Sequence, residues 1–165
     1  MSNTQYAFIQ RTSVPDRAAL QTAIDALGFD LKLDPTYTPF EDSGSSPCVL
    51  NGREGFGFEI YYSDVGEVTA GPEGLFAISS GRDHCISFVW HSSMNDLACA
   101  MIVGSALAKD FGAVVSYEGN PPQSVEELVA AAHESIKLGN EEKPPMYAET
   151  ATTKTKQRKP WWKLW

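Results

Sequence analysis

Residues 83–117 have the sequence DHCISFVWHSSMNDLACAMIVGSALAKDFGAVVSY and predict a strand, a helix and a second strand in direct succession. The segment 84–91 is short, β-branched and aromatic, which is typical of a buried strand. Ser93 has the side chain of a helix N-cap and is followed three positions later by an acid. We expect a helix over 94–111 and a strand over 113–117. Because only three residues of this helix are charged, it must be covered on more than one side or offer a face to a partner.

The residues before this segment predict two strands around one helix. Residues 6–10 (YAFIQ) have the composition of a strand. Ser13 can cap a helix whose apolar residues recur at i, i+3, i+4 and i+7, and Gly28 ends it. Alternating apolar and charged residues over 29–34 indicate a half-buried strand. The proline- and serine-rich residues 35–47 indicate an exposed loop.

A β-hairpin with two unlike faces is predicted next. The dipeptide Asn51-Gly52 is the strongest short-range hairpin signal, and the returning strand, 56–62, places alternate residues on opposite faces of a sheet. We expect one face to be apolar and to meet the helices, and the other to be mixed and open. The expected inner residues are Phe58, Ile60, Ile86, Phe88 and Trp90, and the expected outer residues are Glu59, Tyr61, Cys85, Ser87, Val89 and His91.

The remaining residues predict a loop, a last helix and a tail. Residues 64–82 are rich in glycine and acidic residues, which indicates a loop with about one helical turn. Ser124 opens a capping-box pattern for a helix that we expect to end at Gly139. The polar, basic and proline-containing residues 140–165 are expected to form a flexible tail, which leaves a single domain over 1–139.

The order of these elements, β-α-β, a hairpin and then β-α-β-α, favours an α+β fold. A mainly antiparallel sheet with helices packed on one face accommodates it, as a ferredoxin-like variant with an extra C-terminal helix. The chain has no apolar run long enough to span a bilayer, and its first residues lack a secretory pattern. The cysteines, Cys48, Cys85 and Cys99, are odd in number and show no CxxC spacing, so we expect reduced thiols in a cytoplasmic protein.

Charge is distributed unevenly along the chain. Residues 146–165 carry five basic residues and one acidic residue, a net charge of +4, whereas the rest of the chain carries −12. An acidic body is a poor partner for nucleic acid, because phosphate contacts need Lys and Arg. The electrostatic field of this acidic part would steer a basic protein towards it. The alternative explanation of the acidic charge is that it keeps the protein soluble. The tail also carries Trp161, Trp162 and Trp165, which suggest weak contact with an anionic membrane or a groove on a partner, or solubility alone.

No motif for catalysis, a cofactor or a metal is evident. His84 and His91 lie on opposite faces of one strand with Cα atoms about 23 Å apart, so they cannot share an ion. A nucleophile elbow and a phosphate loop are missing, and Gly55-Phe56-Gly57 lacks the third glycine and the following helix of a dinucleotide loop. Cys99 lies within an apolar helix, which favours a buried, inert thiol. We therefore expect a protein without enzyme activity, cofactor or metal.

Three motifs carry a resemblance to a known family: GFEIYY at 57–62, a Gly-Arg-Asp turn at 81–83, and FVWHSSMNDLACAMIVGSALAKDFGAVVSYEG at 88–119. Over about residues 56–119 the chain resembles small bacterial immunity proteins of interbacterial toxins, including effectors of type VI secretion. The resemblance implies a cytoplasmic protein without enzyme activity that occludes a cognate toxin. It carries no signature of functional residues.

Three hypotheses for the function follow. The first is the immunity role, in which acidic and aromatic side chains contact a basic toxin. The contact residues expected are Glu59, Tyr61, Asp64, Glu67 and Glu118. The second is a small-ligand-binding or regulatory domain, which a concavity beside His91 or Tyr61 would favour. The third is an enzyme that uses His91 or Cys85, which a base within hydrogen-bond reach of Cys85 would favour.

Overall fold

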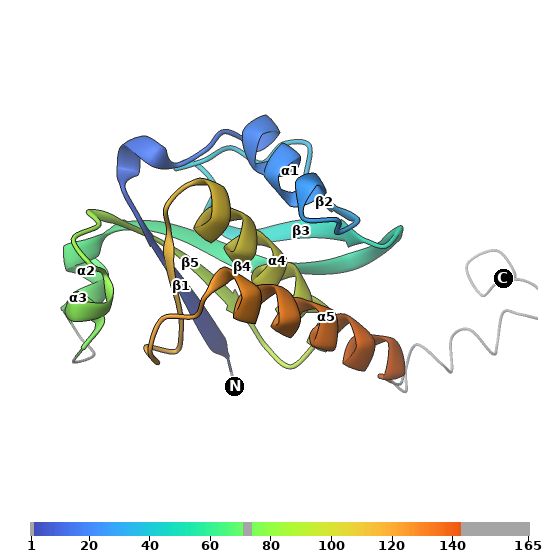
Figure 1. Cartoon of the computed structure of the whole chain (residues 1–165). Helices are drawn as coiled ribbons and strands as arrows, with labels where there is room; N and C mark the ends of the chain where they lie inside the picture. The colour runs from blue at the N-terminus through green and yellow to red at the C-terminus, as the bar shows by residue number, and fades with distance from the viewer. Residues whose placement is uncertain (1, 71–73, 143–165) are drawn as a thin grey trace, which may run out of the picture.

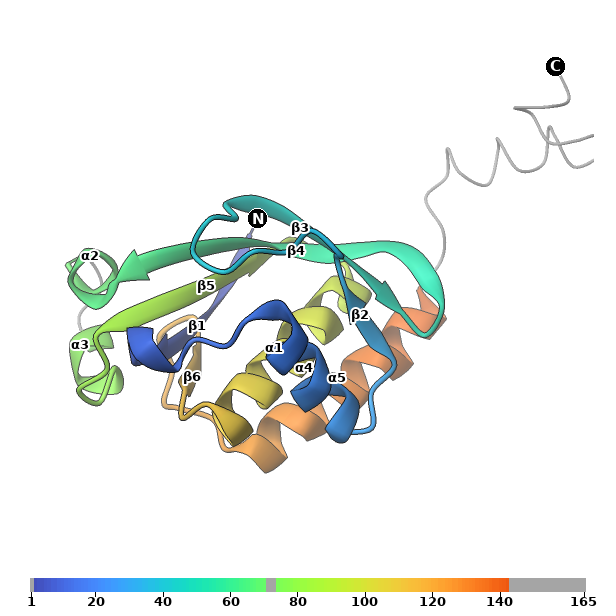
Figure 2. The same cartoon turned by 90° about the horizontal axis from the view of Figure 1, so that it is seen from above.

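The computed structural model describes residues 2–70 and 74–142, which form one antiparallel sheet with helices on one face (Figures 1 and 2). The helices on that face are α1 (Arg17–Ala26), α4 (Met94–Asp110) and α5 (Val125–Glu141). The strands are β1 (Asn3–Ile9), β2 (Leu31–Leu33), β3 (Gly44–Leu50), β4 (Arg53–Asp64), β5 (His84–Trp90) and β6 (Val114–Tyr117). Their order across the sheet is β2-β3-β4-β5-β1-β6.

The topology confirms the predicted α+β fold of ferredoxin-like type. Four strands, in the order β6-β1-β5-β4, form two split β-α-β units, one through α1 and one through α4. The short strand β2 and its partner β3 are inserted between α1 and β4 and extend the sheet beyond β4. Helix α5 is the additional C-terminal helix, and it packs on α4.

The inner face of the sheet carries the main core, as predicted. Its largest side chains are 6% exposed or less: Phe58, Ile60, Ile86, Phe88 and Trp90. Helix α4 lies between this face, α1 and α5, which explains why almost its whole circumference is apolar. It can approach β1 closely because Gly104 has no side chain: a Cβ there would lie 2.5 Å from Nε2 of Gln5.

Ser124 opens α5 with the predicted capping box, but the predicted N-cap of α1 and the predicted end of α5 are wrong. Ser13 ends a short 3-10 helix, η1 (Arg11–Ser13), and the side chain of Asp16 caps α1 by accepting a hydrogen bond from the N–H of Ala19 at 2.8 Å. Gly139 does not end α5, which continues to Glu141. A Cβ at Gly139 would lie 2.5 Å from Oδ1 of Asn95, so this glycine serves the close packing of α5 on α4 rather than helix termination.

Two predicted loops contain regular structure. Strand β3 begins at Gly44, inside the expected loop 35–47, because the long strand β4 pairs with it along its whole length. β2 pairs only with residues 48–50 of β3, so Pro47 lies where β3 is an edge strand. A proline is tolerated there because no neighbouring strand needs its missing N–H. The hairpin turn is confirmed, with φ of 52° at Asn51 and 78° at Gly52, both of which a type I′ turn requires.

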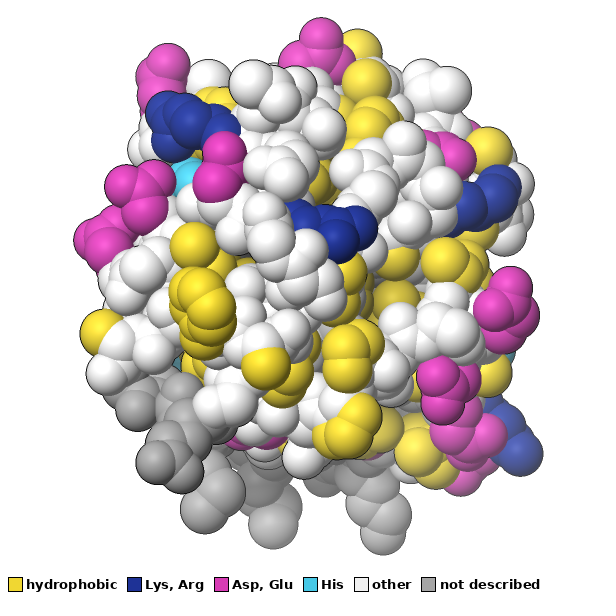
Figure 3. Space-filling model, turned by 60° about the vertical axis from the view of Figure 1, so that its left-hand side comes forward, with side chains coloured by type: hydrophobic (Ala, Val, Ile, Leu, Met, Phe, Trp, Pro, Cys, Tyr) yellow, Lys and Arg dark blue, Asp and Glu magenta, His cyan; other side chains and the backbone are white. Residues whose placement is uncertain are grey.

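The segment between β4 and β5 contains two short helices, α2 (Val65–Thr69) and α3 (Leu75–Ile78), where a loop with about one helical turn was predicted. They cover one end of the outer sheet face, where Leu75 packs with Phe8 and Cys85 in a second buried cluster. In Figure 3 hydrophobic side chains reach the surface at this end of the molecule among acidic ones. Phe76 of α3 is the most exposed large apolar residue described, at 73%.

Most of the expected tail, from residue 143 onward, lies outside the described residues. Within residues 2–70 and 74–142, no helix has the length and apolar character needed to cross a membrane.

Candidate functional site

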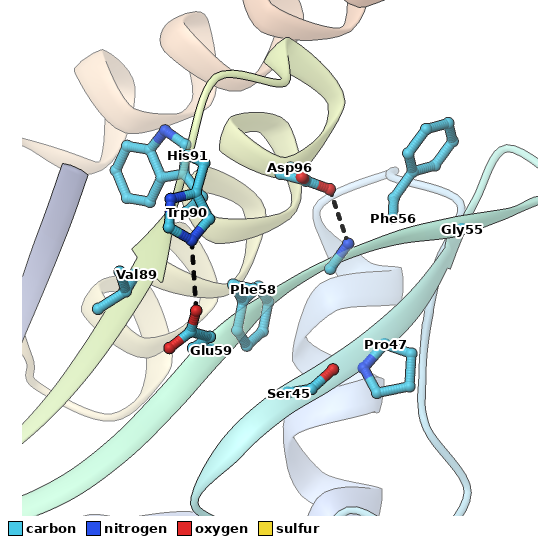
Figure 4. Close-up of a pocket in the computed structure, with 11 residues that line it drawn as sticks. Ser45, Pro47, Gly55, Phe56, Phe58, Glu59, Val89, Trp90, His91 and Asp96 are labelled. Carbon is cyan, nitrogen blue, oxygen red and sulfur yellow. Dashed lines mark hydrogen bonds and ion pairs between the residues drawn. The ribbon is translucent and has the colours of Figure 1, made fainter. Parts of the chain in front are cut away.

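The candidate site is a hollow at the point where β4 and β5 separate (Figure 4). The two strands pair from Asp64 and His84 to Glu59 and Val89. Beyond that point β4 continues along β3, while β5 continues along β1 to Trp90. The hollow between them has a volume of about 400 Å³. It is lined by Ser45, Pro47, Gly55, Phe56, Gly57, Phe58, Glu59, Val89, Trp90, His91 and Asp96.

Asp96 closes the inner side of the hollow. It lies in the first turn of α4, where its N–H donates to the N-cap Ser93 at 3.3 Å. Its Oδ1 accepts a hydrogen bond of 3.0 Å from the N–H of Gly57, which has no partner on β5. Burial raises the pKa of Asp96, and Glu142 acts in the same direction, while the Gly57 bond and His91 act against them. The carboxyl group is thus a partly buried acceptor at the base of the hollow.

Gly57 brings β4 close to β3 beside the hollow. Its φ is 153°, and a Cβ at this position would lie 2.4 Å from the carbonyl oxygen of Ser46. Because backbone atoms on both strands are involved, no side chain fits without moving one of them. Gly57 therefore sets the path by which β4 leaves β5.

The mouth of the hollow carries a hydrogen-bonded row of three side chains. The hydroxyl of Tyr61 donates to Oε1 of Glu59 at 2.5 Å, and Nε2 of His91 lies 3.4 Å from Oε2 of the same carboxylate. These two contacts lower the pKa of Glu59, the Tyr61 bond most. The same bond raises the pKa of Tyr61. Glu59 is therefore a fixed anionic group, and its side chain is 39% exposed.

Three of the five predicted contact residues share the outer face. Glu59 lies opposite Val89, which lies opposite Thr4, and the N–H of Glu118 donates to the carbonyl of Thr4 at 2.8 Å. Glu59 and Glu118 are therefore the two ends of one row of neighbouring residues across the sheet. At the usual strand spacing they lie roughly 14 Å apart. Tyr61 belongs to the neighbouring row and is 36% exposed.

The other two predicted contact residues lie at the opposite end of β4. Asp64 and Glu67 form a capping box for α2, in which each side chain accepts from the other residue's backbone N–H. Asp64 lies about 17 Å along the strand from Glu59, and Glu67 follows it in α2. Asp64 also faces inward, with Oδ1 3.7 Å from Nδ1 of His84. The structure thus gives these two acids a local role and separates them from the hollow.

Sequence reasoning missed Asp96 and Gly57 as site residues. Asp96 was interpreted only as a first-turn acid of a helix, and Gly55-Phe56-Gly57 only as an incomplete dinucleotide loop. The signal that could have found the site is the repeated glycine inside a strand, which marks a close backbone approach or a departure from regular pairing. His91 was expected on the outer face and was not among the predicted contact residues, yet it lines the hollow.

The other reactive side chains do not converge on the hollow. Burial raises the pKa of Cys85 to about 12, and its Sγ lies 3.8 Å from Oγ of Ser87. A thiol in this state remains protonated at neutral pH and is a poor nucleophile. His84 is buried on the inner face, away from His91. Over residues 2–70 and 74–142, no three His, Cys, Asp or Glu side chains are grouped so that they could hold a metal ion.

Comparison of the chain with family models, curated proteins and solved structures finds no match. The chemistry of the site is therefore argued from its geometry. An ionised carboxylate at the mouth, a second carboxyl group at the base and a wall that contains Phe56 and Pro47 suit a cationic group on a long side chain.

Proposed function

We propose that the protein binds a basic partner protein through the uncovered part of its outer sheet face. The observation that carries this proposal is the position of Glu59: an ionised carboxylate, held in place by Tyr61 and His91, at the mouth of a hollow whose outer side is not covered by any helix of residues 2–70 and 74–142. Glu118 extends the anionic character across the same row.

The hollow supports recognition of an arginine or lysine side chain. The carboxylate of Glu59 offers a charge-assisted acceptor, which makes shorter and stronger hydrogen bonds than a neutral group. Asp96 offers a second acceptor deeper in the hollow, and Phe56 an aromatic surface for the stem or the cation. The described residues carry 19 acidic and 7 basic side chains, so a basic partner would also approach in a favourable field.

The nature of the partner follows from the family resemblance. We propose that it is a cognate antibacterial toxin, and that the protein neutralises the toxin in the cytoplasm by occlusion, without enzyme activity of its own. The support for this step is the similarity over about residues 56–119 together with the anionic, uncovered surface. Trp161, Trp162 and Trp165 are a second proposed contact with a partner or membrane, and they lie outside the described residues.

The test is binding and protection with a matched pair of variants. The product of the gene next to this one is co-purified with the full chain, and its affinity is measured at two salt concentrations. We expect the double variant E59Q/E118Q to bind about tenfold more weakly and to protect cells less. The double variant E126Q/E134Q removes the same charge from exposed positions on α5 and should change affinity about twofold at most.

Equal weakening by both double variants would show that only net charge matters, and would overturn the assignment of this face. Absence of any complex, together with survival of cells that lack the protein and meet the toxin, would overturn the immunity role.

A second candidate function is favoured by the concavity beside His91. Its volume of about 400 Å³ is in the range of small-ligand sites. A cationic metabolite would use the same groups as an arginine side chain. A thermal shift with small guanidinium or ammonium compounds, lost in Glu59→Gln and retained in Glu134→Gln, would favour this ligand-binding role over protein binding.

A further inference from the structure

The last described helix ends beside the hollow. Both carboxylate oxygens of Glu142, which follows α5, accept from the N–H of Met94 at 3.2 and 3.3 Å. Met94 opens α4 two residues before Asp96, and Glu142 contributes to the raised pKa of Asp96. On the other side, Nη2 of Arg53 donates to Oδ1 of Asn140 at 2.9 Å. Glu142, the last residue described before 143–165, therefore lies near the side of the hollow that Asp96 closes.

The chain that continues from this point is opposite in charge to the described residues. Residues 143–165 carry six basic residues and one acidic residue, whereas the described residues carry 7 basic and 19 acidic ones. Residues 154–165 (KTKQRKPWWKLW) carry four basic residues before the first tryptophan, and Lys163 lies among the three tryptophans. Such a segment offers a cation for the two carboxyl groups of the hollow and an indole ring that can pack against Phe56.

The connection is long enough for the segment to reach the hollow of its own chain. The 11 residues 143–153 have a root-mean-square span of roughly 17–20 Å if they behave as a coil. The stretch of β4 from Phe56 to Tyr61 covers about 17 Å. A tethered segment of this kind has an effective concentration on the order of millimolar, so even a weak contact would be populated.

We propose that residues 154–165 occupy the hollow of the same chain, with a basic side chain directed to Glu59 and Asp96 and a tryptophan ring against Phe56 and Pro47. The segment then competes with the basic partner for the hollow, and the partner must displace it. This inference rests on the cation-binding hollow of the proposed function, but not on the identity of the partner.

The experiment is site-specific photo-crosslinking in the full chain at low protein concentration. The photoreactive residue p-benzoylphenylalanine replaces Trp162, and the cross-linked peptides are identified by mass spectrometry. We expect cross-links within one chain to the peptides around Gly55–Glu59 and His91–Asp96. The same photoreactive residue in place of Phe76 on α3 is the control, and it should not label these peptides.

Two variants connect the cross-link to charge. Glu59→Gln and Glu59→Gln/Asp96→Asn should lower its yield about threefold and fivefold or more, while E126Q/E134Q should leave it unchanged. The Asn at position 96 retains an acceptor for the Gly57 N–H, and the thermal unfolding midpoint of each variant confirms that it is folded. A rise in salt from 50 to 500 mM should also lower the yield.

Three outcomes would overturn the inference: cross-links mainly between chains, cross-links to other surfaces, or a yield that does not respond to E59Q. Tryptophan fluorescence that shifts only with vesicles of phosphatidylcholine and phosphatidylglycerol, without the cross-link to the hollow, would assign the segment to a membrane instead. If E59Q/E118Q abolishes partner binding while the cross-link is absent, the proposed function stands and this inference fails. If the cross-link to the hollow is present but no partner binds, this inference stands and the proposed function fails.

Discussion

The two ends of the β4–β5 pair differ in what covers the outer face of the sheet. At one end Leu75, Phe8 and Cys85 are each 1% exposed or less, beneath α3. At the other end the side chains of Glu59 and His91 are 39% and 64% exposed, above the hollow. Strand alternation is the same at both ends, so it does not decide which outer side chains are buried.

The connections between the elements account for this difference. The 19-residue connection from β4 to β5 returns across the outer face and places α2 and α3 on it. At the other end β5 leads into α4, which lies on the inner face, and β3 joins β4 through a two-residue turn. No described segment at that end is available to cover the outer face, and the site stays open.

The two histidines at the ends of β5 show the same contrast. His84 has 3% of its side chain exposed, and neither ring nitrogen has a hydrogen-bond partner among the described residues. His91, on the opposite face, pairs with Glu59. Burial lowers the pKa of His84, with a further contribution from Arg11, against the opposing effect of Asp64 and Asp83.

The largest expected effect is at the covered end. Leu75→Ala removes the side chain that seals Cys85, and we expect a loss of about 2–5 kcal/mol in the free energy of unfolding. Cys85 is fully buried in the original protein. In the variant water and a thiol reagent can reach its sulfur, so the rate of modification of Cys85 should rise. Phe76→Ala, one residue away and 73% exposed, should change stability by about 0.5 kcal/mol or less. Equal effects of the two variants would contradict the described position of α3.

A second effect is expected at the open end. Gly57→Ala places a Cβ 2.4 Å from the carbonyl oxygen of Ser46, so β4 and β3 must shift. Gly55→Ala is the control: the added Cβ has nothing within 4 Å, so this variant has only the strain of an alanine at a φ of 95° and no steric clash. We expect Gly57→Ala to lose about 1–3 kcal/mol more than this control in chemical denaturation. A difference of zero would show that the close approach is not needed for the fold.

The sequence predicted this fold through elements whose pattern is strong over many residues. The apolar helix after Ser93, the Asn51-Gly52 turn and the alternation of β4 each appear in the structure as expected. Gly139 was misinterpreted because a glycine near a helix end has two physical uses, termination and close packing. The neighbour that decides between them, Asn95, is 44 residues away in the sequence.

The candidate site could be predicted only in part. Glu59 and Tyr61 were found because alternation alone places them on the outer face. The hollow was not, because it arises where two strands choose different partners: β4 follows β3, and β5 follows β1. Such a choice depends on pairing across the whole sheet, and the repeated glycine at 55 and 57 indicates only that β4 departs from regular pairing, not which strand it follows. The capping role of Asp64 and Glu67 was missed because residues 64–82 were interpreted as a loop.

A smaller, pH-dependent effect distinguishes the two histidines. Because the pKa of folded His84 is lowered, the unfolded chain takes up a proton near its ordinary pKa while the folded protein does not. The free energy of unfolding should therefore decrease as the pH falls below about 6.5, by about 1.4 kcal/mol per pH unit at most. His84→Leu should remove this slope, and His133→Leu, at an exposed site on α5, should retain it. Urea denaturation between pH 5 and 7.5 measures the free energy of unfolding of the two variants. If both variants show the same slope, the pH dependence comes from groups other than His84.

The smallest expected effect concerns the row of side chains at the mouth of the hollow. The hydrogen bond from Tyr61 is the main cause of the lowered pKa of Glu59, and the contact with His91 is the second. Tyr61→Phe should therefore raise the pKa of Glu59 towards its ordinary value, His91→Gln should raise it less, and Tyr6→Phe should leave it unchanged. Carbon-13 NMR of the glutamate carboxyl groups measures the shift, with Glu59→Gln to assign the signal. If His91→Gln has the larger effect, the imidazole rather than the phenol is the main group that lowers the pKa of Glu59, and the order of the two contacts at the open end would be reversed.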